Sequence, residues 1–394
     1  MENMNISIIL PVYNEELYIR RTLSSLKNQT YPNYEAIIVD DYSSDDTCSI
    51  ITEFARGDSR FRLIRNDRNM GAPRSRNRGM SLAGGEYIVF LDADDCFEPD
   101  FLERLYYTAV SIDADVVACK SHIVNAVDQD VRVFGQWRRL ERLMGDESLM
   151  VLDDPSGYPG ICSLVDLPAW NKLIRRRHLV DHCIKFQEID SYNDLSFSFL
   201  SCLLASRLAF LNECLITYYQ YHSGGITNKR AKGYCPIVPA YDAVIRHKVI
   251  QQCNVRDELI NRAIHNVIAV ALMEGRSPAG RGQILEELCS KVDHDWIPLV
   301  SAFELVIDPA CRFGLEFIRS HTAEDISIDS IERYIFKRIL EIDGTQAICV
   351  MPGEDEQRLL SETLRVAGDK RIIYSSDNGI SGGMKVYRLR ELWI

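Results

Sequence analysis

Three carboxylates follow directly after one apolar stretch of the chain. The run 86–91 (EYIVFL) leads into Asp92, Asp94 and Asp95, and Gly84-Gly85 bounds it upstream. Such a run predicts a buried strand, and the carboxyl end of a parallel strand is where open α/β sheets bind ligands. Asp92 and Asp94 point to the same side of an extended segment and repel each other. An oxygen-seeking cation, Mg²⁺ or Mn²⁺, is their natural partner. An acidic surface turn is the alternative.

Length, charge and cysteine usage restrict the class of protein. The chain has 394 residues, of which 46% are hydrophobic and 26% charged, as in an ordinary globular protein of two or three domains. A net charge of −12 argues against non-specific nucleic-acid binding. Twelve cysteines without a Cys-x-x-Cys pair, and no apolar signal segment at the start, favour a cytoplasmic protein with reduced thiols. No apolar run approaches the roughly 20 residues that span a bilayer, which predicts no transmembrane segment.

Strands and helices alternate around the acidic stretch. Apolar runs predict strands at residues 6–13, 34–39, 61–64 and 86–91. A helix capped by Asn14 is predicted to end near Asn28, and a second helix follows the strand 34–39. The polar segment between the third strand and Gly79 is predicted to be a loop. Strands that alternate with helices at these lengths predict parallel βαβ units in a doubly wound α/β sheet.

Three segments and one loop of this predicted sheet resemble the glycosyltransferases of family 2. The segments are 9–15 (ILPVYNE), 38–47 (IVDDYSSDDT) and 90–95 (FLDADD), and the loop contains 69–71 (NMG) and 75–79 (SRNRG). The resemblance covers about residues 4–228. It implies the Rossmann-like fold called GT-A, a nucleotide-sugar donor and inversion at the anomeric carbon. Tyr42 stands where the family usually has Gly, which would narrow the base pocket, and Ser75 where it usually has Ala.

The resemblance also implies which residues bind the donor. They are Pro11, Tyr13, Glu15, Asp41, Arg76, Asp92 and Ala93. The carboxylate of Asp41 can accept the ring N–H of uracil, which favours UDP, although guanine also presents an N–H and leaves GDP open. Asp92 is expected at the donor ribose. Arg76 is expected to reach the base or the phosphates, unless it is only a solvated arginine of the loop.

A Mn²⁺ or Mg²⁺ ion is implied as cofactor, with Asp94 and His222 as its ligands. Residues 218–227 (YYQYHSGGIT) look like the family's Tyr-x-x-His-x-x-Ser-Ile-Thr segment, with Gly225 at the place of the serine. A histidine without such a context is more often structural. The ion would neutralise the charge that develops on the leaving diphosphate.

The catalytic base is expected on the acceptor side, after 170–173 (WNKL), which resembles a family element. Relatives commonly have Glu-Asp at the place of Asn193-Asp194, and the Asp is the base. Asp194 lies just ahead of an apolar helical pattern, so the helix start is expected to keep it ionised. A simple N-cap aspartate is the alternative reading. Glu188 and Asp190 are weaker candidates for the base.

Beyond this region the sequence changes character. The predicted domains are 1–228, the GT-A catalytic domain; 229–340, a helical region; and 341–394, a small Rossmann-like α/β appendage. The appendage is predicted from strands at 347–351, 371–377 and 385–387 and a helix at 356–366. It lacks the Gly-x-Gly-x-x-Gly fingerprint, which indicates an interaction or stability module without a nucleotide.

These features predict an inverting, metal-dependent glycosyltransferase for surface polysaccharide synthesis. Its partners are a nucleotide sugar, preferably a UDP-sugar, and a glycan or lipid-linked acceptor; peripheral membrane association at the inner face and a homo-oligomer stay open. A catalytically inactive sugar-nucleotide-binding scaffold is the first alternative, favoured by Asn193 and opposed by the intact acidic residues. A nicotinamide-dependent oxidoreductase is the second, opposed by the missing glycine fingerprint.

Overall fold

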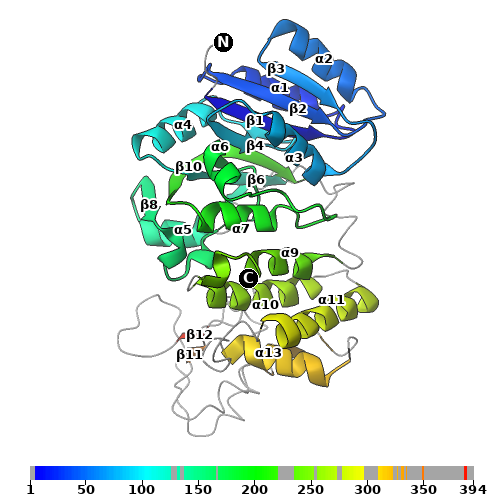
Figure 1. The fold of residues 1–394 in the computed structure, drawn as a ribbon, viewed down its shortest axis with the longest axis vertical. Coiled ribbons are helices and arrows are strands. Elements are labelled where there is room, and N and C mark those ends of the chain that lie inside the picture. The colour runs from blue at the N-terminus through cyan, green and yellow to red at the C-terminus, as the bar shows by residue number, and fades with distance from the viewer. Residues whose placement is uncertain are drawn as a thin grey trace. The chain divides into compact units, whose positions relative to one another are not determined.

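The structure is a computed structural model, and it divides into two compact units (Figure 1). The first comprises Met1–Asn228 and Arg246–Val255, and the second Lys229–Ile245 and Arg256–Ile394. The residues described are 5–125, 131–133, 137–165, 167–220, 235–252, 255–272, 277–296, 309–322, 326, 330–331, 334, 348–349 and 386–387.

Within the described part of the first unit, ten strands form one mixed sheet. They are β1 (Ile6–Val12), β2 (Tyr34–Asp40), β3 (Phe61–Arg65), β4 (Tyr87–Phe90), β5 (Cys96–Phe97), β6 (Val116–Asn125), β7 (Val131–Val133), β8 (Leu149–Asp153), β9 (Lys172–Arg175) and β10 (Arg207–Gln220). Their order is β3-β2-β1-β4-β9-β6-β10-β5, with β7 on β6 and β8 on β10. The strands β1 to β4 run parallel, whereas β9 is antiparallel to its neighbours β4 and β6.

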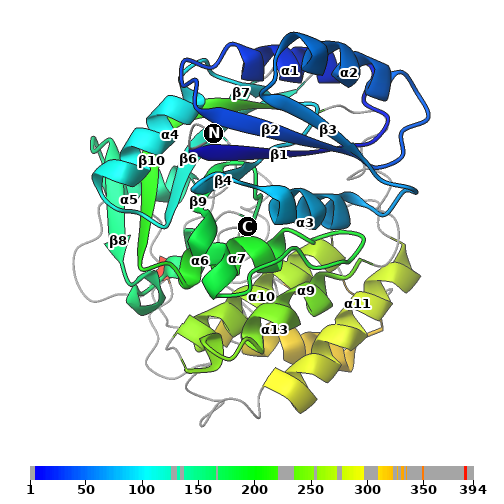
Figure 2. The same ribbon diagram turned by 45° about the horizontal axis from the view of Figure 1, so that its top comes forward.

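Helices cover both faces of the sheet. They are α1 (Ile19–Lys27), α2 (Thr47–Gly57), α3 (Ala72–Leu82), α4 (Phe101–Ser111), α5 (Trp137–Met144), α6 (Arg176–Asp181) and α7 (Leu195–Leu203), with 3₁₀ turns η1 (Pro155–Gly157), η2 (Ile161–Ser163) and η3 (Ile250–Gln252). Apolar side chains of α1, α2 and α4 share one buried cluster with the sheet, for example Leu23, Ile51 and Leu105. Figure 2 shows α1 and α2 on one side of the sheet and α3 and α7 on the other. The sheet is therefore the middle of three layers.

The four predicted strands are confirmed to within one residue at each end. The predicted start of the first helix is wrong, because α1 begins at Ile19 and Asn14 lies before it with a positive φ of 54°. The side chain of Asn14 accepts a hydrogen bond from the backbone N–H of Ser44 instead (2.8 Å). A neighbouring loop thus takes the group that the pattern assigns to the helix cap.

The polar segment before Gly79 is also a correction, since it forms the helix α3 rather than a loop. Its contact with the sheet uses small residues, and Ser75 and Gly79 are buried. A Cβ at Gly79 would lie 2.5 Å from a methyl group of Ile9, so only glycine allows the helix to pack this closely. An apolar periodicity cannot reveal such a helix, because its buried face is made of small side chains rather than large ones.

The described part of the second unit is helical. It contains α9 (Ile237–Ile245), most of α10 (Val255–Ala271), α11 (Pro278–Lys291), the π-helical turn η4 (Val292–Trp296) and α13 (Pro309–Ser320). The predicted apolar stripes are core, as the buried Val244, Ile264 and Leu288 show. Asp242 accepts hydrogen bonds from the indole N–H of Trp296 (2.9 Å) and from the ammonium group of Lys291 (3.2 Å).

Of the predicted appendage, the structure describes β11 (Ile348–Cys349) and β12 (Val386–Tyr387), which pair in parallel. The predicted helix 356–366 and strand 371–377 lie outside the described residues, and the three-part division 1–228, 229–340 and 341–394 stays a prediction. Among the helices described, none is long and apolar enough to cross a membrane.

Candidate active site

Acidic residues follow the carboxyl ends of adjacent parallel strands. The register pairs Val12, at the end of β1, with Asp40, at the end of β2, and β4 lies on the other side of β1. Asp41 follows β2 and residues 92–95 follow β4, so all of them lie at the same edge of the sheet. We call this the carboxyl edge. It is the place where open α/β sheets bind ligands.

The loops after β1 and β2 are held together by hydrogen bonds that cross between them. The backbone N–H of Asn14 donates to the hydroxyl of Ser43 (2.9 Å), and the N–H of Ser44 donates back to the Asn14 side chain (2.8 Å). The N–H of Glu15 donates to the hydroxyl of Thr47 (2.8 Å). These hydrogen bonds fix the two loops relative to each other. The residues of either loop that are predicted to contact the nucleotide are therefore positioned together.

Asp41 anchors a third loop. Its carboxylate accepts hydrogen bonds from the side chain of Asn66 (2.7 Å) and from the backbone N–H groups of Met70 (2.8 Å) and Gly71 (2.7 Å). The residue is only 3% exposed. A uracil ring would have to use the acceptor capacity that these three bonds leave, so the contact with the base stays a prediction. Holding the 66–71 loop is a role that the sequence did not indicate.

The other residues predicted at the nucleotide differ in exposure. The side chains of Pro11 and Ala93 are buried, so these residues have only their backbone to present to a ligand. Tyr13, in contrast, is 46% exposed and follows β1 directly. Among these three residues, Tyr13 is therefore the one whose side chain is available for contact.

Several carboxyl groups of the carboxyl edge lie close together and are partly buried. Burial, together with the charges of Asp94 and Asp92, raises the pKa of Glu15 to about 8. Burial also raises the pKa of Asp94 to about 6, again with a contribution from Asp92. Carboxyl groups whose pKa values are raised by burial and by neighbouring carboxylates form an environment that favours a bound cation.

This group of carboxyl side chains fits the implied Mn²⁺ or Mg²⁺ ion, because carboxylate oxygens such as those of Asp94 are suitable ligands. The residues that the structure describes nevertheless include no group of three His, Cys, Asp or Glu side chains placed to hold a metal ion. The second predicted ligand, His222, lies outside the described residues.

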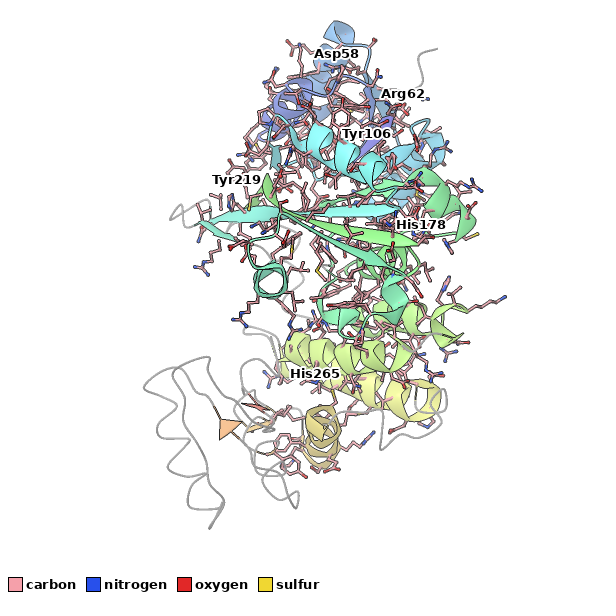
Figure 3. The ribbon with its side chains drawn as sticks, turned by 90° about the vertical axis from the view of Figure 1, so that its left-hand side faces the viewer. Asp58, Arg62, Tyr106, His178, Tyr219 and His265 are labelled. Atoms are coloured by element: carbon pink, nitrogen blue, oxygen red, sulfur yellow. The ribbon has the colours of Figure 1, made fainter. Side chains whose placement is uncertain are left out.

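Asp95, the third carboxylate of the acidic stretch, supports the site from within. It is fully buried and accepts a hydrogen bond from the backbone N–H of Tyr219 (3.3 Å) near the end of β10. Burial raises the pKa of Asp95 well above the usual value. The hydroxyl of Thr22 contacts the carbonyl oxygens of Ala93 (2.7 Å) and Asp95 (2.8 Å). Figure 3 shows Tyr219 and His178 toward opposite ends of the strands.

Arg76 connects the carboxyl edge to the predicted acceptor side. Its guanidinium group donates to Asp92 (2.7 Å) and to the side-chain oxygen of Asn193 (3.1 Å). The side chain is only 12% exposed and lies over the ring of Phe186, 5.2 Å from its centroid. Arg76 is therefore not a solvated arginine of a loop. It belongs to α3, and its two contacts join residues far apart in the sequence.

Two further residues of α3 hold the segment that precedes α7. The side chain of Asn77 donates to the carbonyl oxygen of Phe186 and accepts from its N–H, both at 2.9 Å, as a neighbouring strand would. The ring of Phe186 stacks on that of Phe197 in α7, with centroids 4.0 Å apart. These contacts explain why an Arg-Asn pair on α3 positions the start of α7.

Asp194 stands at the N-cap position of α7, but its side chain makes no cap hydrogen bond. The simple N-cap reading is therefore wrong. The expected electrostatics are also reversed, because burial raises the pKa of Asp194, with Arg76 opposing the shift and Asp92 adding to it. Desolvation of the carboxylate by partial burial therefore affects the pKa of Asp194 more than the N-terminus of α7 does. Asp194, Arg76 and Asp92 thus lie close enough to influence one another.

The weaker candidates for the base have different surroundings. Glu188 is exposed and forms an ion pair with Arg74 (2.7 Å), in which both side chains are about half exposed. Asp190 is exposed as well. Neither carboxylate has the partly buried position of Asp194.

Lys172 is a residue whose role the sequence did not reveal. It is 1% exposed, donates to the side-chain oxygen of Asn171 (2.8 Å), and lowers the pKa of Asp194 against the effect of burial. The resemblance at residues 170–173 marked the segment but not this function. The sequence signal that could have indicated this role is a lysine within a mostly apolar segment.

Comparison with known proteins places this geometry in a family. A family model for glycosyl transferase family 2 matches residues 7–163. The glycosyltransferase GlyG of Streptococcus pneumoniae is 31% identical over 224 residues, 56% of this chain and 72% of GlyG. WfgD of Escherichia coli, a UDP-Glc:alpha-D-GlcNAc-diphosphoundecaprenol beta-1,3-glucosyltransferase, is 42% identical over 103 residues, 26% of this chain and 40% of WfgD.

A solved structure shows the same fold. S. aureus TarS 1–349, in complex with UDP-GlcNAc, matches with a TM-score of 0.65 and 20% identity over 87% of this chain and 95% of that chain. The predicted α/β fold of the GT-A type is confirmed. The aligned regions span 65%, 72% and 30% of the length of three curated relatives. The match over most of GlyG, together with the family model, shows that the chain belongs to glycosyl transferase family 2.

Proposed function

We propose that the chain is an inverting glycosyltransferase that moves a sugar from a UDP-sugar to a hydroxyl group of a glycan or lipid-linked acceptor in surface polysaccharide synthesis. The observation that carries this proposal is the placement of Arg76 between Asp92 and Asn193. It joins a donor-side carboxylate to the start of the helix that bears Asp194. A donor site and a base are thus parts of one arrangement.

Relatives support the choice of donor and acceptor. TarS has been solved with UDP-GlcNAc, and the name of WfgD specifies UDP-glucose and a lipid-linked diphosphate acceptor. The carboxyl edge of this chain carries the same kind of acidic strand ends that the resemblance assigns to the nucleotide sugar. We therefore place UDP at the loops of Tyr13, Glu15 and Asp41, with its ribose at Asp92.

Asp194 is the group that we assign as general base. Inversion requires the acceptor oxygen to attack the anomeric carbon on the face opposite the departing UDP, while its proton passes to a carboxylate. A raised pKa brings Asp194 closer to the working pH, which strengthens it as a base. Arg76 and Lys172 oppose the rise, so they favour the ionised form that accepts the proton.

A divalent ion held by Asp94 and His222 would supply charge neutralisation at the leaving diphosphate. The protein's own residues orient the donor. The bond from Arg76 fixes the carboxylate of Asp92, and the buried Asp95 holds the backbone of β10 beside the acidic stretch.

A donor screen with the purified full-length chain tests the proposal. UDP-glucose, UDP-GlcNAc and a GDP-sugar are offered with a lipid-diphosphate GlcNAc acceptor, in Mn²⁺, Mg²⁺ or EDTA, and nucleotide release is measured. We expect UDP release that depends on acceptor and metal, and a product of inverted anomeric configuration by NMR. Binding of a UDP-sugar with no turnover in any combination would identify the inactive scaffold instead, and release of GDP alone would overturn the choice of nucleotide.

A further inference from the structure

The loop after β2 contains a tyrosine in a conformation that suits glycine. Tyr42 has a φ of 70°, in the left-handed region that non-glycine residues rarely adopt. Strain of this kind persists where the surroundings determine the backbone, and it occurs preferentially at functional sites. A glycine at this position would adopt the same backbone without strain.

The neighbours of Tyr42 explain how the strain is maintained. The backbone N–H of Ser43 donates to both carboxylate oxygens of Asp40, each at 3.2 Å. Arg65 pairs with Asp40 (3.2 Å) and donates to the carbonyl oxygen of Ser43 (2.8 Å). On the other side, the carboxylate of Asp41 is held by the 66–71 loop. The chain is therefore fixed before and after Tyr42.

The ring of Tyr42 is not part of the protein core. It is 52% exposed, and the guanidinium carbon of Arg65 lies 5.4 Å from the ring centroid. An exposed cation–π contact of this kind is weak, so it does not account for a strained tyrosine. Tyr42 follows Asp41 at the carboxyl edge, in a loop that is hydrogen-bonded to the loop that follows Tyr13.

We infer that the ring of Tyr42 stacks against the nucleobase of the donor and so adds affinity for the nucleoside part of UDP. This inference rests on the proposed function and names one further contact within it. Aromatic rings stack on any base through the π-face, so Tyr42 contributes to binding a nucleotide rather than to reading which base it is. The diphosphate and the sugar are not part of the contact.

Binding measurements with the full-length chain test this inference. Calorimetry with UDP, and separately with inorganic pyrophosphate, is carried out in Mn²⁺ on Tyr42→Phe, Tyr42→Ala and Tyr42→Gly. We expect Tyr42→Phe to bind UDP like the wild type, because it keeps the ring. The other two variants should bind UDP roughly tenfold more weakly, as expected for a lost base–aromatic stack, with pyrophosphate affinity unchanged.

Melting temperature provides a second, independent readout. Tyr42→Gly removes both strain and ring, so it should melt about 2–4 °C higher while binding UDP less well. Cys183→Gly is the matched control: Cys183 is exposed, has a φ of 54° and follows α6, so this variant should gain stability and keep UDP affinity.

Two results overturn the inference. One is a Tyr42→Ala variant with wild-type UDP affinity, and the other is an equal loss for UDP and pyrophosphate, which would mean that the loop, not a stack, was disturbed. If the wild type bound neither UDP nor GDP, the proposed function itself would fail, and the variants would not be needed to show it.

Discussion

The two edges of the catalytic sheet use charge in opposite ways. At the amino-terminal ends of β4 and β6, Arg175 forms ion pairs with Glu86 (3.4 Å), Asp113 (2.5 Å) and Asp115 (3.2 Å). The side chain of Arg175 also lies over the ring of Tyr87. Carboxylates at this edge thus have a cation beside them, and their arrangement contributes to holding strands and turns together.

At the carboxyl edge, Arg76 pairs with Asp92 and Arg65 with Asp40, but Glu15 and Asp94 are influenced mainly by burial and by other carboxylates. Burial raises the pKa values of Glu15 and Asp94, the charge of Asp92 adds to both shifts, and the charge of Asp94 adds to that of Glu15. The contrast shows that acidic residues alone do not identify a site. Acidic residues whose pKa values are raised by burial and by neighbouring carboxylates do, because their ionised form is unfavourable for the folded protein until a ligand neutralises it.

The largest expected effect concerns Asp194. Asp194→Asn keeps the shape of the side chain but cannot take a proton, so kcat should fall by about 10²–10⁴-fold, with donor KM little changed. Steady-state kinetics with a saturating acceptor measures this. Asp190→Asn is the matched control and should stay near wild-type turnover. If Asp190→Asn or Glu188→Gln lost activity while Asp194→Asn kept it, the base would be that neighbour.

The second effect concerns Asp94, at the carboxyl edge, in comparison with Asp115. Asp94→Asn should lower turnover by roughly 10²–10³-fold, the size expected when a group that stabilises transition-state charge is removed. Mn²⁺-dependent binding of UDP should weaken in parallel, which calorimetry can detect without turnover. Asp115→Asn should leave both unchanged. Full activity of Asp94→Asn in EDTA would exclude the proposed role of metal and carboxylate.

The third effect is on stability, and its sign should differ between the edges. The pKa of Asp94 in the folded protein, about 6, exceeds its ordinary value of 3.8, so the folded state binds the proton more tightly than the unfolded chain. Ionisation of Asp94 therefore destabilises the fold as the pH rises from about 4 to about 6, and fully so above that range.

Asp94→Asn removes this destabilisation. In EDTA, it should raise the free energy of unfolding by about 1–3 kcal/mol at pH 8 and leave it unchanged at pH 4. Asp115→Asn should instead lower it by about 1–3 kcal/mol, since Asp115 also accepts the backbone N–H of Ser206 (2.8 Å). Urea unfolding at the two pH values measures both variants. A loss of stability for Asp94→Asn at pH 8 would contradict the contrast between the edges.

The smallest effect concerns Glu188, whose ion pair with Arg74 is about half exposed on both sides. Exposed pairs contribute little, so Glu188→Gln should change the free energy of unfolding by no more than about 0.5 kcal/mol. Its kcat should stay within about twofold of the wild type, because Asn77 and Phe186 hold the same segment independently. A larger loss of kcat would show that this pair, and not only α3, positions Asp194.

The sequence predicted those parts of the fold that depend on large apolar side chains. The strands 6–12 and 34–40 are almost wholly buried, and continuous apolar runs reveal such strands. The helix α3 was missed because it packs through Ser75 and Gly79, whose small side chains produce no periodic signal. Its glycine is needed for the close approach to β1, which becomes visible only in three dimensions.

The candidate site shows the same limit. The acidic strand end and Asp194 could be predicted because each lies in a short, contiguous sequence motif. The bonds of Arg76 to Asp92 and Asn193 could not, since those partners are far apart in the chain and only folding brings them together. The direction of the Asp194 pKa shift also escaped prediction, because it depends on burial by the tertiary structure rather than on the helix start.

The late position of β10 in the chain has a consequence for how the enzyme is made. This strand pairs in parallel with β6, from Leu208 beside Val116 onward, and its far end pairs with β5 next to the acidic stretch. It also supplies the backbone N–H that Asp95 accepts. During synthesis, the strands β1 to β4 leave the ribosome well before β10 does.

The residues of the carboxyl edge therefore lack the contacts that β10 provides until this last described strand of the sheet has been synthesised. Pairing between segments so distant in sequence is slow, and an unpaired β6 presents a free strand edge in the meantime. Folding of the catalytic unit should thus be limited by the arrival of β10, and a nascent chain that stalls before it should be a substrate for chaperones rather than a binder of UDP.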